Sequence, residues 1–202
     1  MSITQRRRER VQAVLKDRLE SVVVILEAVH RRHNASAILR SCECFGVHEV
    51  HMISRGFKPS KGAARGSERW LEVVGHSQTA QCIADLKARG FKVYAADLSD
   101  EAFAPDTLPI DGKVAILMGA ELTGVSDEAR LLVDGYVCVP MRGMTESLNV
   151  SVAAACIISR VSERKRASVG GGDLSEVRRA AFIEAWERSE ESAKAGMEAR
   201  LS

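Results

Sequence analysis

The sequence predicts an α/β protein built on one parallel sheet with helices on both faces. Short β-branched runs alternate along the chain with helical segments, which is typical of βαβ units and their parallel strands. The 202 residues are 46% hydrophobic and 28% charged, as expected for one globular domain with extensions. The apolar run at residues 22–26 is far shorter than the ~20 residues of a membrane span. Because no secretory signal is recognisable, we expect a cytoplasmic protein without a membrane segment.

Six segments predict helices. The first two carry apolar stripes at helical spacing. The fifth is rich in small residues, and the sixth is rich in charged residues. In chain order, the expected helices cover residues 6–19, 34–45, 79–89, 126–133, 147–161 and 174–199. Gly46 and Gly90 are placed to end the second and third helices, and Ser126 is placed to cap the fourth.

Six further segments predict strands. They are short apolar runs bounded by Gly, Pro and polar residues. In chain order, the expected strands cover residues 22–26, 47–53, 70–74, 91–96, 114–118 and 136–139. Residues 54–69 are rich in Gly, Lys and Arg and predict a loop, and the glycines of residues 168–173 predict a hinge before the charged tail.

Charge is distributed unevenly along the chain, although the net charge is only +2. Residues 1–75 contain 14 Lys and Arg against 8 Asp and Glu, whereas residues 76–202 contain 15 against 19. The basic half is therefore a candidate face for a polyanion. Aromatic residues make up only 4% of the chain, which argues against a single-strand binder built on base stacking.

Cysteine and histidine patterns predict neither a disulfide framework nor a metal site. The five cysteines include no C-x-x-C pair, and several lie in apolar or helical patterns, so we expect reduced thiols. The five histidines match no usual ligand spacing.

Three segments are candidates for a functional site. The Rossmann and Walker glycine motifs, H-E-x-x-H and the G-x-S-x-G elbow are all absent. The candidate segments are HNASAILRS at 33–41, ILMGAELTGV at 116–125 and VPMRGMTESLNVS at 139–151. The second and third each follow a predicted strand, at the edge of a parallel sheet where ligands bind. Glycines there let the backbone approach a ligand, and apolar side chains can form walls for an adenine, namely Met118, Val139, Met141 and Leu148.

In this order and spacing, the three segments resemble the signature motifs of the TrmH type of SPOUT-class RNA methyltransferases. NASAILRSCECFGV, LMGAELTGVS and VPMRGMTESLNVSVAAA match those motifs nearly position for position, and the resemblance covers residues 23–158. The basic N-terminal helix, the GSERW segment and the helical tail are similar to those of tRNA (guanosine-18-2′-O)-methyltransferases. The resemblance implies a SPOUT (α/β knot) fold with a C-terminal trefoil knot, bound S-adenosyl-L-methionine and a homodimer.

The resemblance also implies a division of the chain and the roles of its residues. It implies a basic helix at 1–20, a SPOUT methyltransferase domain at 21–165 and a C-terminal helical extension at 166–202. The implied catalytic residues are Arg40, Asn34, Glu121, Ser147 and Asn149. The implied cofactor-binding residues are Ala96, Leu117, Met118, Gly119, Val139, Met141 and Leu148. Thr145-Glu146 departs from the apolar-Gln pair that close tRNA relatives often carry, and this departure bears on the target nucleotide.

The implied reaction is methyl transfer to a ribose 2′-hydroxyl of tRNA, at guanosine 18 of the D-loop. Phosphate contacts are expected from basic residues outside the three motifs or at their edge, namely Arg6, Arg7, Arg8, Arg10, Arg31, Arg32, Lys58, Lys61 and Arg65. Two alternatives stay open, which are 2′-O-methylation of another tRNA position or of ribosomal RNA, and RNA binding without catalysis. A non-catalytic relative is expected to lack Arg40 or the Ser-Leu-Asn of residues 147–149, and this chain has both.

Overall fold

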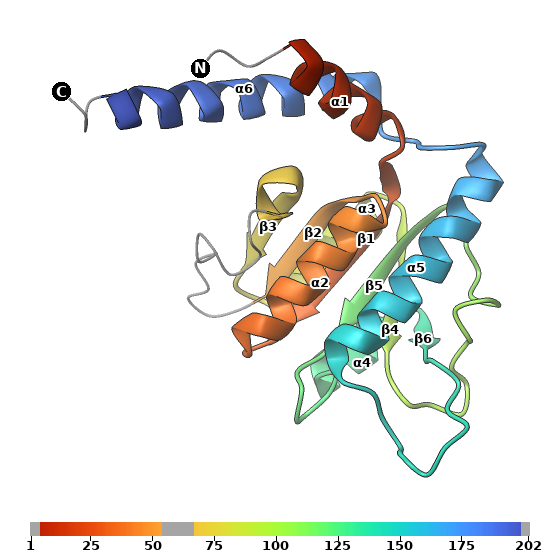
Figure 1. The fold of residues 1–202 in the computed structure, drawn as a ribbon. Coiled ribbons are helices and arrows are strands. Elements are labelled where there is room, and N and C mark those ends of the chain that lie inside the picture. Colours follow the sequence, from red (N-terminus) through yellow and green to blue (C-terminus); the bar gives the residue numbers. More distant parts are fainter. Residues whose placement is uncertain (1–4, 54–66, 199–202) are drawn as a thin grey trace.

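A computed structural model describes residues 5–53 and 67–198, and it shows one six-stranded parallel sheet (Figure 1). The strand order is β3-β2-β1-β5-β4-β6, and every neighbouring pair is parallel. The strands are β1 (Leu19–Glu27), β2 (Val47–Ile53), β3 (Glu72–His76), β4 (Phe91–Ala96), β5 (Lys113–Met118) and β6 (Gly135–Val137). The predicted fold class is therefore confirmed.

Helices cover both faces of the sheet, as predicted (Figure 1). The helices are α1 (Gln5–Lys16), α2 (Arg32–Cys44), α3 (Thr79–Ala88), α4 (Asp127–Leu132), α5 (Val150–Val169) and α6 (Glu176–Glu198). Successive side chains of a strand point to opposite faces, so Met118 and Ile116 pack with α2 and α5 whereas Leu117 packs with α3 and α4. Two cores thus form from the same strands.

The fifth helix is shifted relative to the predicted 147–161. It begins at Val150 because the side chain of Asn149 accepts hydrogen bonds from the backbone N–H groups of Ser151, at 2.9 Å, and Val152, at 3.4 Å. It continues to Val169 and ends where Gly170 adopts a left-handed φ of 77°. The boundary expected between residues 165 and 166 therefore falls inside α5.

Other boundaries of helices and strands also differ from the predicted ones. The first predicted helix is too long, because α1 ends at Lys16 and Leu19 already pairs with Val47 in the sheet. Trp70 belongs to a short 3-10 helix at Ser67–Trp70 rather than to β3. Ser126 caps α4 as predicted, since its hydroxyl oxygen accepts from the backbone N–H of Ala129.

The terminal helices α1 and α6 pack on each other beyond the end of the sheet at which β1 begins (Figure 1). Val11 and Leu15 of α1 form a small buried cluster with Leu174 and Trp186. The carboxylate of Asp173 accepts a 2.6 Å hydrogen bond from the backbone N–H of Glu20 and so fixes the chain before α6. Among the described residues, no helix is long and apolar enough to span a membrane.

Candidate active site

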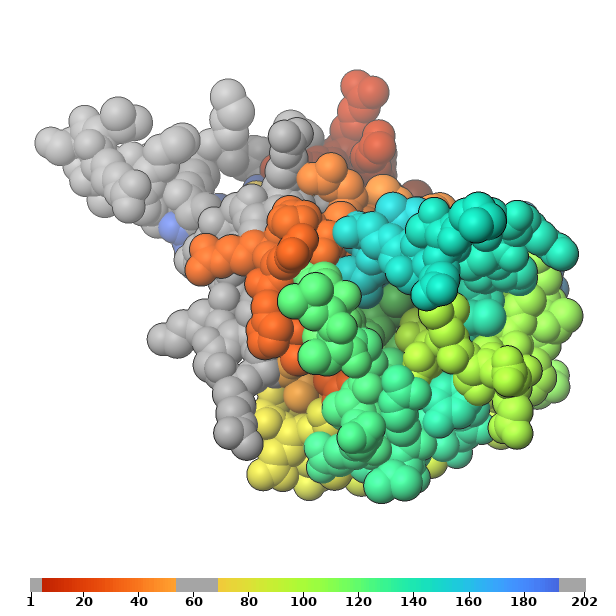
Figure 2. Space-filling view, turned by 90° about the horizontal axis from the view of Figure 1, so that it is seen from below, coloured from red at the N-terminus to blue at the C-terminus, as the bar shows by residue number. Residues whose placement is uncertain are grey.

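A cavity of about 220 Å³ opens at the carboxyl edge of the sheet. Figure 2 looks onto this edge and shows the hollow between chain segments coloured lime, green and cyan. The ends of the adjacent strands β5, β4 and β6 meet there, and the start of α5 closes one side. The lining comprises residues 96–98, 118–121, 137–139, 147–148, Gly124, Met141, Val150, Ala153 and Ile157. This is the position at which open parallel sheets bind ligands.

Six of the seven predicted cofactor residues line the cavity. They are Ala96, Met118, Gly119, Val139, Met141 and Leu148. The exception is Leu117, whose fully buried side chain lies in the core on the opposite face of the sheet. Only the backbone of Leu117 therefore stays available for the predicted role.

Position 119 requires a glycine because the backbone of Gly124 lies very close to it, and not because of an unusual φ. A Cβ atom at this position would lie 2.3 Å from the carbonyl carbon of Gly124. The two sides of the tight turn are held by reciprocal backbone hydrogen bonds of 2.9 Å between Ala120 and Gly124. Any side chain at Gly119 would force this turn, and with it one wall of the cavity, to open.

Some lining residues were not among the predicted ones. Asp97 and Leu98 directly follow Ala96 at the end of β4, so the predicted end of that strand was the available signal. Ala153 and Ile157 lie one turn apart on the same face of α5, and their helical spacing predicts a shared face but not which ligand it meets.

Residues of all three motifs meet in one hydrogen-bonded chain. The side-chain amide N–H of Asn34 donates to Glu121 Oε1 at 2.9 Å, and the amide N–H of Asn149 donates to Asn34 Oδ1 at 3.3 Å. The backbone N–H of Arg31 also donates to Glu121 Oε1, at 3.2 Å. Asn34 is 2% exposed, so its amide depends on these two protein partners.

Glu121 is held as a carboxylate. Its partial burial alone would raise its pKa, but hydrogen bonds from the Asn34 amide and from backbone N–H groups at Glu121, Arg31 and His30 lower the pKa below its ordinary value. The residue thus acts as an acceptor that joins the start of α2 to the loop after β5.

Arg40 and Ser147 stand apart from this chain of hydrogen bonds. The side chain of Arg40 is exposed on α2 and makes no hydrogen bond or ion pair with a described residue. It lies six residues, ~9 Å along the helix axis, from Asn34 and on a different face of the helix. Ser147 is exposed at the rim of the cavity.

The predicted phosphate-binding arginines fall into two groups. Arg7 and Arg8 pair with Glu190 and Glu187 of α6, at 2.8 and 3.0 Å. The others within the described residues are exposed and have no ion-pair partner there, and they are Arg6, Arg10, Arg31 and Arg32. Lys58, Lys61 and Arg65 lie outside the described residues.

Comparison with known proteins decides the family. A model of the SpoU rRNA Methylase family matches residues 21–159. The chain belongs to this family. It is 41% identical over 169 residues to the tRNA (guanosine(18)-2'-O)-methyltransferase of Thermus thermophilus, covering 83% of this chain and 87% of that protein. It is 39% identical over 163 residues to the enzyme of the same name from Escherichia coli, covering 80% and 71%.

The structure matches a member of the same family along nearly its whole length. The crystal structure of the Aquifex aeolicus TrmH/SpoU tRNA modifying enzyme superposes with a TM-score of 0.82 at 31% identity, covering 92% of this chain and 97% of that chain. The match includes more of the chain than residues 21–159, so it extends into the terminal segments outside the matched family domain.

Proposed function

We propose that this SpoU-family protein transfers a methyl group from S-adenosylmethionine to the ribose 2′-hydroxyl of guanosine 18 in tRNA. The observation that carries the proposal is the joining of the three motifs into one site beside a cavity at the carboxyl edge of the sheet. The names of the relatives at 41% and 39% identity support the same reaction and the same nucleotide. They favour guanosine 18 over ribosomal RNA or another tRNA position.

The cavity suits the proposed cofactor. Met118, Val139 and Met141 offer apolar walls for an adenine ring, and the glycine turn after β5 offers backbone groups at close range. The sulfonium of S-adenosylmethionine supplies an already activated methyl group, so the protein mainly has to position it against the ribose. The hydrogen-bonded chain through Asn34 keeps both cavity loops in place.

We assign to Arg40 the role of assisting the reaction at the 2′-hydroxyl group that receives the methyl group. A new C–O bond forms as the C–S bond breaks, and the hydroxyl proton has to leave. A guanidinium carries a positive charge and a planar fork of donors, so Arg40 fits a role in binding a neighbouring RNA phosphate while that proton is shared or removed. Its exposed side chain, unpaired within the described residues, is available for such an interaction.

A second copy of the chain completes the proposed enzyme. Met144 is 100% exposed, Val152 47% and Leu148 37%, so the third motif and the first turn of α5 present apolar side chains to solvent. A homodimer through this face would cover them and close the cavity further. Light scattering at micromolar concentration should give twice the chain mass, and Val152→Asp should shift the protein toward a monomer.

Each segment of the chain has a role in the proposed reaction. Residues 21–165 would hold the cofactor, with the chain closed as a trefoil knot, whereas residues 1–20 and 166–202 would dock the tRNA in the cytoplasm. Arg31 and Arg32 lie next to the Glu121 contact and would bind phosphates beside the reacting nucleotide.

The test uses purified protein, labelled S-adenosylmethionine and two tRNA transcripts that differ at one atom. One transcript carries guanosine 18 and the other carries 2′-deoxyguanosine 18, which has the same base and no acceptor hydroxyl. We expect label only in the first transcript, with the methyl mapped by mass spectrometry to nucleotide 18. Label in both transcripts, or in ribosomal RNA instead, would contradict the assigned target.

A further inference from the structure

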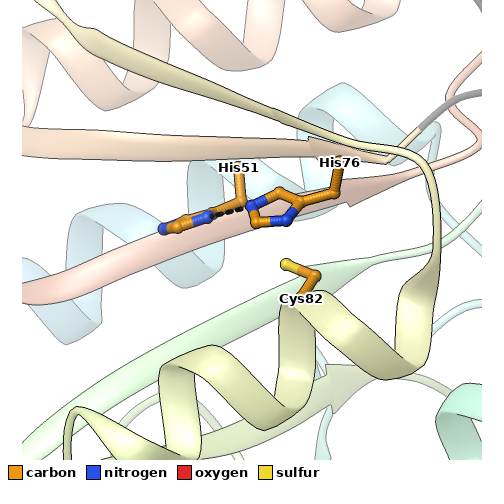
Figure 3. Close-up of side chains that lie close together, drawn as sticks. All are labelled: His51, His76 and Cys82. Atoms are coloured by element: carbon orange, nitrogen blue, oxygen red, sulfur yellow. Dashed lines mark hydrogen bonds between the residues drawn. The ribbon is translucent and has the colours of Figure 1, made fainter.

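A second cluster of chemically reactive side chains lies between the edge of the sheet and α3. His51 on β2, His76 at the end of β3 and Cys82 in α3 each offer one atom, and these three atoms lie within 4.8 Å of one another. The thiol of Cys82 points from the helix toward the two imidazole rings (Figure 3). None of the three residues lines the cavity described above, so methyl transfer leaves the cluster without a role.

Strand register brings these residues together. His51 lies opposite Val74 in the parallel pair of β2 and β3, and His76 is two residues further along its strand. Side chains two apart share a face of the sheet, so both imidazoles point to the face that α3 covers. Cys82 is fully buried at that face, His51 is 2% exposed, and His76 is half-buried.

Glu49 fixes the hydrogen positions on His51. Its Oε1 lies 2.6 Å from His51 Nε2, and its carboxylate is also paired with the guanidinium groups of Arg89 and Arg178. A carboxylate held in this way is an acceptor, so the ring hydrogen of His51 belongs on Nε2, and this arrangement leaves a lone pair on Nδ1. That lone pair faces His76, whose Nε2 is 2.8 Å away. A histidine whose outer nitrogen is held by a carboxylate is the usual arrangement at protein-bound metals.

We propose that this cluster is a zinc site, formed by His51 Nδ1, His76 Nε2 and the thiolate of Cys82, with water as the fourth ligand. Two imidazole nitrogens and a thiolate are a ligand set that zinc accepts in tetrahedral geometry. This proposal differs from the prediction, made from the sequence, that the protein has no metal site. Ligand spacing along the sequence does not show which strands and which helix become neighbours.

The distances need only small adjustments. Zn–N bonds of ~2.0–2.1 Å and a Zn–S bond of ~2.3 Å place the two nitrogens about 3.3 Å apart and each nitrogen about 3.6 Å from the sulfur. The nitrogens, now at 2.8 Å, have to separate slightly, and the sulfur, which lies within 4.8 Å of both, has to be about 3.6 Å from each. The zinc ion replaces the hydrogen that now lies between the two rings.

Zinc binding releases one proton. Zinc binds the thiolate form of cysteine, so the thiol of Cys82 has to lose its proton. Its proton leaves to solvent as the Zn–S bond forms, while His76 stays neutral and carries its hydrogen on Nδ1 instead of Nε2. The bound ion would tie the edge strand β3 to α3 and stabilise the folded chain, since the unfolded chain lacks this arrangement.

The experiment measures metal binding to the full-length chain without a histidine tag, after treatment with a chelator. Zinc is titrated against a chromophoric chelator, and cobalt(II) serves as a spectroscopic probe of the ligands. We expect one zinc per chain, one proton released, a thiolate-to-cobalt charge-transfer band and a higher melting temperature with zinc. Binding of no zinc in competition with the chelator would overturn the proposal.

Variants test the ligands one at a time. Cys82→Ala removes the thiolate and keeps an apolar side chain in the core, and His76→Gln removes the half-buried imidazole. Each should weaken zinc binding by at least about 100-fold, and Cys82→Ala should also remove the charge-transfer band. Cys44→Ser, at an exposed cysteine of α2, is the matched control and should bind zinc within about twofold of the wild type. Equal zinc affinity in all four proteins, or equal loss in the control, would overturn the site.

Discussion

Asn34 and Glu121 are separated by 87 residues, and the side-chain amide of Asn34 donates a 2.9 Å hydrogen bond to Glu121 Oε1. The same buried amide accepts from Asn149 through its oxygen. One side chain therefore joins the start of α2, the loop after β5 and the start of α5. Since two of these three segments form walls of the cavity, the cavity depends on a side chain that lies outside it.

Replacing Glu121 by Ala should destabilise the fold and weaken cofactor binding. The buried amide of Asn34 loses its acceptor, which costs about 1–3 kcal/mol in the free energy of unfolding. Glu121→Gln keeps an acceptor oxygen and is expected to lose less than half as much. Urea denaturation measures the stability and calorimetry measures cofactor affinity. Equal stability of Glu121→Ala and the wild type would show that the hydrogen bond from Asn34 is dispensable.

Replacing Arg40 by Ala should reduce methyl transfer by at least about 100-fold and leave cofactor affinity within about twofold. Cofactor affinity should be retained because Arg40 is exposed on α2 and lies outside the lining of the cavity. Single-turnover transfer to tRNA and calorimetry with the cofactor separate the two effects. Arg40→Lys keeps the charge but not the planar fork, so partial activity would indicate phosphate binding. A parallel loss of cofactor affinity would place Arg40 in the cofactor site instead.

The N-terminal arginines should separate into a tRNA-binding pair and a structural pair. Arg6→Gln with Arg10→Gln should weaken tRNA binding and reduce its log–log salt slope by up to ~0.9 for each phosphate that is no longer neutralised, without changing the melting temperature. Arg7→Gln with Arg8→Gln removes the ion pairs to α6 and should lower the melting temperature slightly, because exposed pairs contribute ~0–1 kcal/mol each. Filter binding at several salt concentrations and thermal melting distinguish the pairs. An unchanged salt slope in both double variants would move the RNA surface away from α1.

Acid should destabilise the protein partly through His48. Burial, with the charges of Arg178 and Arg18, lowers the pKa of this 1% exposed ring from 6.5 to about 4. Between those two values the unfolded chain binds more protons than the folded chain, so the free energy of unfolding falls as the pH is lowered through this window. The effect is up to about 3 kcal/mol. His48→Gln should remove it from urea-denaturation curves measured between pH 4 and 7, whereas His33→Gln, at an exposed histidine, should not.

Much of the fold could be predicted because the local pattern is strong. The strands at Val47–Ile53 and Phe91–Ala96 have the predicted bounds, and a glycine directly precedes each of them. The start of α5 was predicted three residues too early, because Ser147 and Asn149 are both good capping residues and only the path of the chain decides between them. Leu117 was assigned to the cavity with Met118, although adjacent strand residues must face opposite sides of the sheet.

The sequence by itself determined the alternation of strands and helices and the three motifs that give the family. Apolar periodicity and glycine positions act over a few residues, so they can be read from a linear chain. Only the tertiary structure decided that Arg7 and Arg8 are paired with α6, and that Asn34 joins Glu121 to Asn149. It likewise decided that His51, His76 and Cys82 meet. These contacts depend on strand order and helix packing, which bring together side chains that the sequence keeps far apart.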